Sequence, residues 1–235
     1  MSESHKEKLD QEIIKFLDEQ YKQFERNYGE IEVANHFSRI LEIIKTRFSN
    51  DQYFKQIKDS EQSWKTRMGH MLEYLFKRNI SSQIGKGLCC SSFTKAELKE
   101  SYDQISKQIT VSFSNNRKML PDIDLVIYRK EPSIKVVAIL SIKKKFRERI
   151  AQVAYWTIKL RQLGGKVKNF MVTTDEDNTF KEKRRTRETE EEIAKAIAIA
   201  EEDINGTFVA AERETLSSEK IKPYKELFDE LRKLS

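Results

Sequence analysis

The chain has 235 residues, with 44 lysines and arginines against 38 aspartates and glutamates, so its formal net charge is +6. Seven glycines and three prolines are too few for a collagen-like, low-complexity or turn-rich all-β protein. No apolar run approaches the ~18 residues of a membrane span, and the charged start of the chain lacks the apolar core of a signal peptide. We therefore expect a cytoplasmic protein with no membrane partner.

The two cysteines, Cys89 and Cys90, are adjacent in the sequence. This neighbouring pair excludes a structural disulfide framework. Because no C-x-x-C motif or nearby histidine pair accompanies them, a zinc site is not expected either.

The first third of the chain has a helical pattern, because apolar residues recur at three- and four-residue steps from residue 8 to about residue 78. One apolar stripe begins at Ile13, a second at Ile31 and a third at Trp64. We interpret residues 1–60 as an N-terminal helical subdomain.

The pattern changes to strands after residue 79, and an amphipathic helix interrupts them. The expected elements are a half-buried strand over 108–113, a hairpin over 124–128 and 135–143, a helix over 146–160 and a strand over 167–173. This order predicts a mixed β-sheet with a hairpin at its centre and a crossover helix beside it. Residues 61–180 are the expected α/β core, and residues 181–235 an extension of helices and a strand.

Polar residues gather at one end of the expected hairpin. Pro121-Asp122-Ile123-Asp124 opens its first strand, and Ser141-Ile142-Lys143 closes its second. Side chains alternate along a strand, so Asp122 and Asp124 share one face, as do Ser141 and Lys143. With the turn centred between residues 131 and 132, Asp122 lies opposite Ser141, whereas moving the turn by one residue favours Asp124.

Carboxylates and a lysine at one site suit metal-assisted phosphodiester hydrolysis. Carboxylates bind Mg²⁺, which polarises a phosphate and lowers the pKa of bound water. We therefore expect Asp122 and Asp124 to be metal ligands, with Asp122 the principal one, and Lys143 to act on the nucleophile.

These residues resemble the PD-(D/E)xK nuclease superfamily, which has Pro-Asp on one strand and acidic-x-Lys on the next, in the order αβββαβ. Ser141 stands where that superfamily has its second acid, as in some type II restriction endonucleases. The segment 143–149 is similar to their K-x-x-x-R-(D/E)-R, best known in the group that cuts around CCGG. The resemblance covers about residues 64–174. It implies an α/β fold with a restriction-endonuclease-like mixed sheet, Mg²⁺ as cofactor and double-stranded DNA as partner.

The resemblance also implies roles for two residues on helices. In the family, a glutamate from the helix before the sheet often reaches the metal site, and Glu73 is the matching residue. Its alternative role is a surface ion pair with Lys77, four positions on. Gln152 is where an amide could replace the acid lost at Ser141, and its alternative is an ordinary exposed glutamine.

Charged residues directly after Lys143 are candidates for DNA binding. We expect Arg147 and Arg149 at the start of a helix, where the arginine fork matches guanine O6 and N7. Glu148 between them would orient both guanidinium groups or accept from cytosine N4. Lys144 and Lys145 add positive charge to the same segment. The alternative is a solvated, self-paired helix start.

We interpret the chain as a type II restriction endonuclease that makes sequence-specific, Mg²⁺-dependent double-strand cuts. Cutting a palindrome requires two active sites related by two-fold symmetry, so a homodimer is the minimum, and pairing of dimers into tetramers stays open. One alternative is a structure-selective nuclease of the same fold, such as a junction resolvase or repair enzyme. Another is a non-catalytic DNA-binding module in which Ser141 marks a decayed site.

Overall fold

A computed structural model describes residues 3–56, 58–147, 149–181 and 187–234. Helices fill the first part of the chain, as their apolar periodicity predicts: α1 (Glu3–Tyr28), the 3-10 helix η1 (Glu32–His36), α2 (Phe37–Phe48), α3 (Gln52–Gln56) and α4 (Ser60–Gln83). Asp59 begins α4, because its side chain accepts a hydrogen bond from the backbone N–H of Gln62. Within the described ranges, every helix is too short or too polar to span a bilayer.

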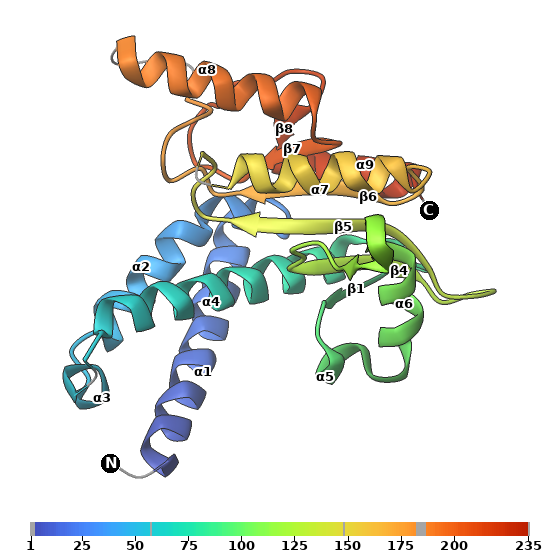
Figure 1. The fold of residues 1–235 in the computed structure, drawn as a ribbon. Coiled ribbons are helices and arrows are strands. Elements are labelled where there is room, and N and C mark those ends of the chain that lie inside the picture. The colour runs from blue at the N-terminus through green and yellow to red at the C-terminus, as the bar shows by residue number, and fades with distance from the viewer. Residues whose placement is uncertain (1–2, 57, 148, 182–186, 235) are drawn as a thin grey trace.

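The centre of the molecule is a mixed sheet with strand order β1-β4-β5-β6-β7-β8 (Figure 1). Its strands are β1 (Cys89–Ser92), β4 (Leu125–Arg129), β5 (Lys135–Lys143), β6 (Lys168–Thr173), β7 (Gly206–Val209) and β8 (Ile221–Pro223). The first three strands pair antiparallel, and β5 through β8 pair parallel. The mixed α/β architecture is therefore confirmed.

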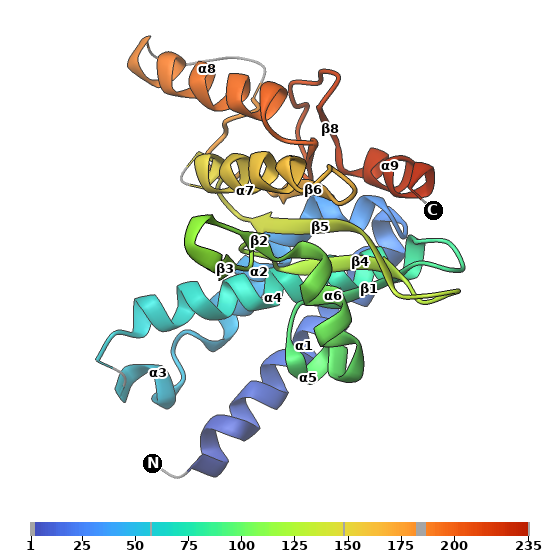
Figure 2. The ribbon, with the colours of Figure 1, turned by 45° about the vertical axis from the view of Figure 1, so that its right-hand side comes forward.

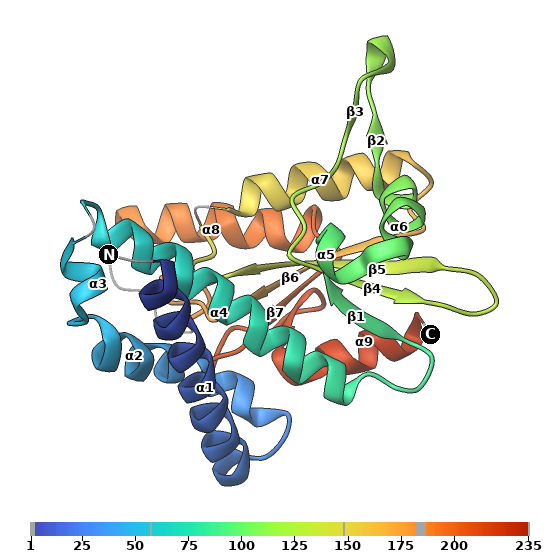
Figure 3. The same ribbon diagram turned by 90° about the horizontal axis from the view of Figure 1, so that it is seen from below.

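The remaining elements lie around this sheet. They are the helices α5 (Lys95–Leu98), α6 (Tyr102–Ile109), α7 (Ile150–Gln162), α8 (Arg187–Glu202) and α9 (Leu227–Lys233), the 3-10 helices η2 (Lys99–Ser101), η3 (Ser114–Asn116) and η4 (Tyr224–Glu226), and the short strands β2 (Val111–Ser112) and β3 (Lys118–Met119). The strands β2 and β3 form a separate hairpin that projects from the body beyond α6 and α7 (Figure 3).

Helices cover both faces of the sheet. Leu125 and Ile127 of β4 pack with α1, α2, α4 and α9 on one face, while Val126 and Tyr128 pack with α6 and α7 on the other. Figure 3 shows these two helical layers on opposite sides of the sheet, and in Figure 2 α7 and α4 lie on either side of β5. Burial on both faces explains why β4 and β5 are almost continuous apolar runs in the sequence.

The prediction of a strand over residues 108–113 was wrong for the first half of that segment. Gln108 and Ile109 end the helix α6, and only Val111–Ser112 is a strand. The competing signal is the four-residue spacing of Ile105 and Ile109, which are both fully buried against the sheet. The antiparallel neighbour of β4 is instead β1.

The pairing of β4 with β5 also differs from the expected register. Leu125 pairs with Leu140 and Val126 with Ile139, and a bulge follows between Ile127 and Tyr128. Continued by one residue, this register places Asp124 opposite Ser141, so the expected pairing of Asp122 with Ser141 was wrong. The turn is displaced toward the C-terminus, which is the shift that favours Asp124.

Candidate active site

Two aspartates and a lysine meet where β5 ends. The Nζ atom of Lys143 lies 2.9 Å from Oδ2 of Asp124 and 3.7 Å from Oδ2 of Asp122. The side chains of Lys143 and Asp124 are only 17% and 11% exposed, whereas that of Asp122 is 45% exposed. Asp124 is therefore the inner carboxylate of the site, and Asp122 lies at its solvent edge.

Backbone contacts fix the inner carboxylate. Oδ2 of Asp124 accepts the backbone N–H of Ile142 at 2.6 Å as well as the Lys143 ammonium. The hydroxyl of buried Ser141 donates to the backbone carbonyl of Asp122 at 3.3 Å. Ser141 thus braces the segment that carries both aspartates.

Glu73 brings a third carboxylate from α4, which packs against β1 and β5. The pKa of Glu73 is raised to about 7, mainly by burial and then by the negative charges of Asp124 and Asp122, against the lowering effect of Lys143. Carboxylates from three places in the chain therefore share one electrostatic environment around a single lysine.

The alternative interpretation of Glu73, a surface pair with Lys77, does not occur in the structure. The Nζ atom of Lys77 instead lies 2.8 Å from Oε2 of Glu97. Glu73 is half-buried, and the charges of the two aspartates and of Lys143 shift its pKa. Its position therefore supports a role at the site.

The donor set suits a divalent cation. Three carboxylates lie around one lysine, and the negative charges of Asp124 and Asp122 add to the effect of burial in raising the pKa of Glu73. Carboxylate oxygens are also the ligands that Mg²⁺ and Ca²⁺ prefer. No three acidic, histidine or cysteine side chains of the described ranges already lie at coordination spacing, and both aspartates contact Lys143. Glu73, Asp122 and Asp124 are nevertheless the residues that could hold such an ion.

The segment after Lys143 is a loop, so the helix begins later than expected and Arg147 lies before it. Helix α7 begins at Ile150, and Arg149 occupies its N-cap position. Phe146 is fully buried and packs edge-on against Phe180, with ring centroids 4.4 Å apart. This anchored ring, together with the side chain of Asp177, which accepts the N–H of Phe146, holds the backbone outside the helix.

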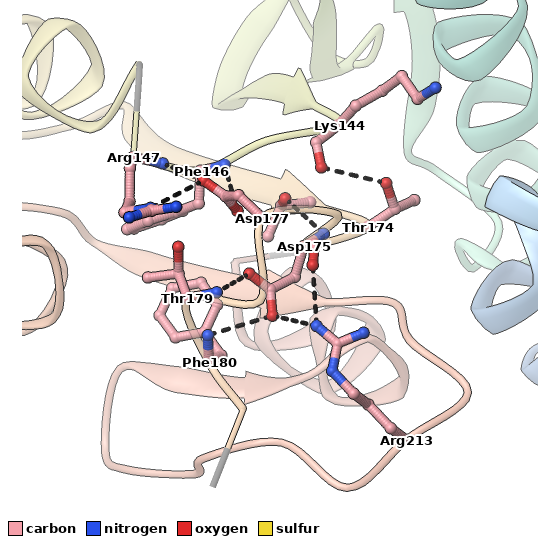
Figure 4. A network of polar contacts seen from close by, with 10 residues as sticks. Lys144, Phe146, Arg147, Thr174, Asp175, Asp177, Thr179, Phe180 and Arg213 are labelled. Atoms are coloured by element: carbon pink, nitrogen blue, oxygen red, sulfur yellow. Dashed lines mark hydrogen bonds and ion pairs between the residues drawn. The ribbon is translucent and has the colours of Figure 1, made fainter. Parts of the chain in front are cut away.

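The cationic side chains of this loop contact different partners. Nζ of Lys144 lies 3.0 Å from Oε1 of Glu176. Nε of Arg147 lies 3.5 Å from Oδ2 of Asp177 (Figure 4). Lys145 is exposed. The loop therefore presents its positive charge at the same end of the sheet as Lys143.

Gln152 is separate from the carboxylates. Gln152 lies on the exposed side of α7, where its amide oxygen accepts from Nη1 of Arg149 at 3.3 Å. It makes no hydrogen bond with Asp122, Asp124 or Glu73. The predicted role of Glu148 falls outside the described residues.

A family model described as "BsaWI restriction endonuclease type 2" matches residues 100–230, more than half of the chain. The chain belongs to this family. It is therefore a type II site-specific deoxyribonuclease, and the resemblance to restriction endonucleases of the PD-(D/E)xK type is confirmed.

Two curated relatives agree with this membership in the BsaWI family. A candidate type II restriction enzyme of Methanocaldococcus jannaschii, MjaVIP, is 30% identical over 167 residues, which cover 64% of this chain and 74% of that protein. The probable type II restriction enzyme HpyAORF263P of Helicobacter pylori is 32% identical over 162 residues, 59% of this chain and 80% of that protein.

A solved structure supports the fold. The crystal structure of a pre-specific complex of the restriction endonuclease BsaWI with DNA superposes with a TM-score of 0.52, covering 94% of this chain and 90% of that one. Sequence identity is 14%, so the likeness shows a shared fold and no more.

Asp175 and Asp177, two aspartates that follow β6, were not identified from the sequence. Asp175 is fully buried and accepts hydrogen bonds from the backbone N–H of Thr179 and Phe180 and from Nη2 of Arg213. The pKa of Asp175 is raised to about 6, because the effect of burial exceeds the lowering effect of these N–H groups and of Arg213. The signal that would have found it is the acidic run 175–177 directly after a buried strand parallel to β5.

Proposed function

We propose that this member of the BsaWI family makes Mg²⁺-dependent, sequence-specific double-strand cuts in DNA by phosphodiester hydrolysis. The observation that carries the proposal is the ammonium of Lys143 lying within 2.9 Å of Asp124 and 3.7 Å of Asp122, with Glu73 electrostatically coupled to all three. Acidic oxygen ligands beside a lysine are what metal-assisted attack on a phosphodiester requires.

Asp124, Glu73 and Asp122 are the proposed residues that hold the metal. We assign the principal role to Asp124, because it is the less exposed aspartate and its orientation is fixed by the N–H of Ile142. When bound, Mg²⁺ supplies a polarised phosphate and a water of lowered pKa. Lys143 keeps a positive charge next to the scissile phosphate and stabilises negative charge as it develops.

The loop after Lys143 is the proposed DNA-reading segment. Arg147 and Arg149 would read guanine edges, and Lys144 and Lys145 would contact phosphates. Glu148 keeps its proposed role beside the arginines. We propose that Gln152 orients Arg149, because its side chain contacts the guanidinium group of that arginine.

Double-stranded DNA is the proposed substrate, and a homodimer the proposed active form. A palindrome presents two equivalent phosphodiesters related by a two-fold axis, whereas one chain supplies a single carboxylate–lysine site. Pairing of dimers into tetramers would add a second copy of the same assembly.

Digestion of a mixed-sequence plasmid tests the proposal. The protein is incubated with supercoiled plasmid and Mg²⁺, and the ends of the fragments are sequenced, with EDTA as the control. We expect linear fragments whose ends share one palindromic sequence. Ends defined by DNA shape without a common sequence would indicate a structure-selective nuclease. Binding without Mg²⁺-dependent cutting would indicate a non-catalytic DNA-binding module.

A further inference from the structure

We infer that Asp177 is a positioning residue for base recognition, which holds the DNA-reading loop in shape without touching DNA. The inference rests on the proposed function, because it concerns the loop that carries Arg147. It adds to that function a specificity determinant that lies 30 residues away in the sequence.

The parallel pairing of β5 with β6 brings Asp177 to this loop. Lys143 pairs with Thr173, so the segments that follow the two strands run side by side beyond the sheet edge. The backbone N–H of Glu176 donates to the carbonyl of Lys144 at 2.9 Å. Asp177 is thereby placed beside the next residues of the reading loop.

The carboxylate of Asp177 binds two consecutive backbone N–H groups. Oδ1 accepts from Phe146 at 3.2 Å and Oδ2 from Arg147 at 3.0 Å (Figure 4). Oδ2 also lies 3.5 Å from Nε of Arg147. Hydrogen bonds to an ionised carboxylate are stronger than neutral ones. Asp177 therefore orients two successive peptide groups and restrains the guanidinium that follows them.

A buried network holds Asp177 itself. Its side chain is only 8% exposed, and Asp175, two residues earlier, is fully buried in contact with Arg213. Asp175 also accepts the N–H groups of Thr179 and Phe180, which closes the turn that contains Asp177 (Figure 4). The turn that positions Asp177 against the loop is therefore itself held by buried hydrogen bonds.

The contacts of Asp177 with the loop should affect base discrimination more than the hydrolytic step. A bidentate arginine contact depends on the direction of the guanidinium, while contacts to phosphate tolerate displacement. Asp177 forms no hydrogen bond with Lys143 or Asp124. Loosening the loop should therefore blur base discrimination and leave the hydrolytic centre in place.

The test compares Asp177→Asn with Glu176→Gln on a panel of duplexes that each differ from the preferred site by one base pair. Both variants lose one negative charge at neighbouring positions. Glu176, however, contacts the side chains of Lys144 and Ser38 and no N–H group of the loop. Affinity is measured with Ca²⁺, and single-turnover cleavage with Mg²⁺.

We expect Asp177→Asn to reduce discrimination about 10-fold at the base pairs read by Arg147, within the range of one bidentate contact. Its single-turnover rate on the preferred site should stay within about 3-fold of wild type. The substitution should change the affinity for the preferred duplex relative to its single-base-pair variants, and not the hydrolytic step. Glu176→Gln should change affinity for every duplex by the same factor. In an Arg147→Ala background, Asp177→Asn should cause no further loss of base discrimination, because both substitutions remove base reading by Arg147.

Asp177→Glu tests the inference if Asp177→Asn unfolds. It retains the charge and both acceptor oxygens, and intermediate discrimination is expected at the same base pairs. Wild-type discrimination in a folded Asp177 variant, or a uniform loss like that of Glu176→Gln, would overturn the inference. A wild-type protein that does not cut would instead refute the proposed nuclease function, and the affinity panel would still test Asp177.

Discussion

Replacing Glu73 by Gln should stabilise the metal-free protein at neutral pH. The pKa of Glu73 is raised from 4.5 to about 7, mainly by burial and then by Asp124. The folded state therefore binds more protons than the unfolded state between these values, so stability is lost as pH rises through that window. At 1.36 kcal/mol per pH unit the difference amounts to about 3 kcal/mol, which partial exposure of the carboxylate reduces to about 2 kcal/mol.

Urea unfolding of wild type and Glu73→Gln in EDTA at pH 4.5, 6 and 8 measures this effect. The wild type should lose about 2 kcal/mol relative to the variant between the lowest and highest pH. Added Mg²⁺ should stabilise the wild type at pH 8 more than the variant, because the ion offsets the clustered negative charge.

Glu97→Gln provides a control of opposite sign. Burial alone would raise the pKa of Glu97, but hydrogen bonds from Lys77 and from the backbone N–H of Ser92 lower it. The stability from this group is present above its unfolded pKa and is lost as pH falls through the lower folded value, so Glu97→Gln should destabilise the protein at neutral pH. Parallel pH dependences for wild type and Glu73→Gln would refute the raised pKa of Glu73 in the folded protein.

Three further predictions concern other parts of the chain. Asp124→Asn should abolish cleavage and Asp122→Asn should only impair it, because Asp124 is the inner carboxylate. Two variants that cut at the wild-type rate would exclude this pair as the metal site. Arg147→Ala and Arg149→Ala should each lose discrimination at particular base pairs on a duplex panel, and uniform losses would make them backbone contacts. Asn79→Ala should lower the free energy of unfolding by about 2–3 kcal/mol, because it leaves the hydroxyl groups of buried Tyr21 and Tyr224 without their partner. An unchanged urea midpoint would contradict this.

Local sequence patterns predicted the elements that bury long apolar faces. The strands β4, β5 and β6 and the helices α4 and α7 all follow from such runs. The segment 108–113 failed because its alternation also contains Ile109, which belongs to the helical spacing set by Ile105. Both periodicities are present in the sequence, and contacts with distant strands decide between them.

The arrangement of the candidate site was predictable where its residues are close in sequence to the strand ends. Asp122, Asp124 and Lys143 were found this way, but their order of burial depends on a turn position and a bulge that the apolar pattern does not specify. Asp177 was missed for a related reason, since its contact with Arg147 arises from the parallel pairing of β5 with β6. That pairing joins segments far apart in the chain.

Single-turnover cleavage by Lys143→Ala and Lys144→Ala tests the proposed active site most directly. Each variant removes one positive charge, but only Lys143 contacts Asp122 and Asp124, whereas Lys144 contacts Glu176. With saturating enzyme and Mg²⁺, Lys143→Ala should cut at least about 100-fold more slowly than wild type, as expected for loss of a group that stabilises transition-state charge. Its affinity for the same duplex in Ca²⁺ should be nearly unchanged, and Lys144→Ala should retain the wild-type rate. Cleavage by Lys143→Ala at the wild-type rate would contradict the assignment of this carboxylate–lysine cluster as the hydrolytic centre.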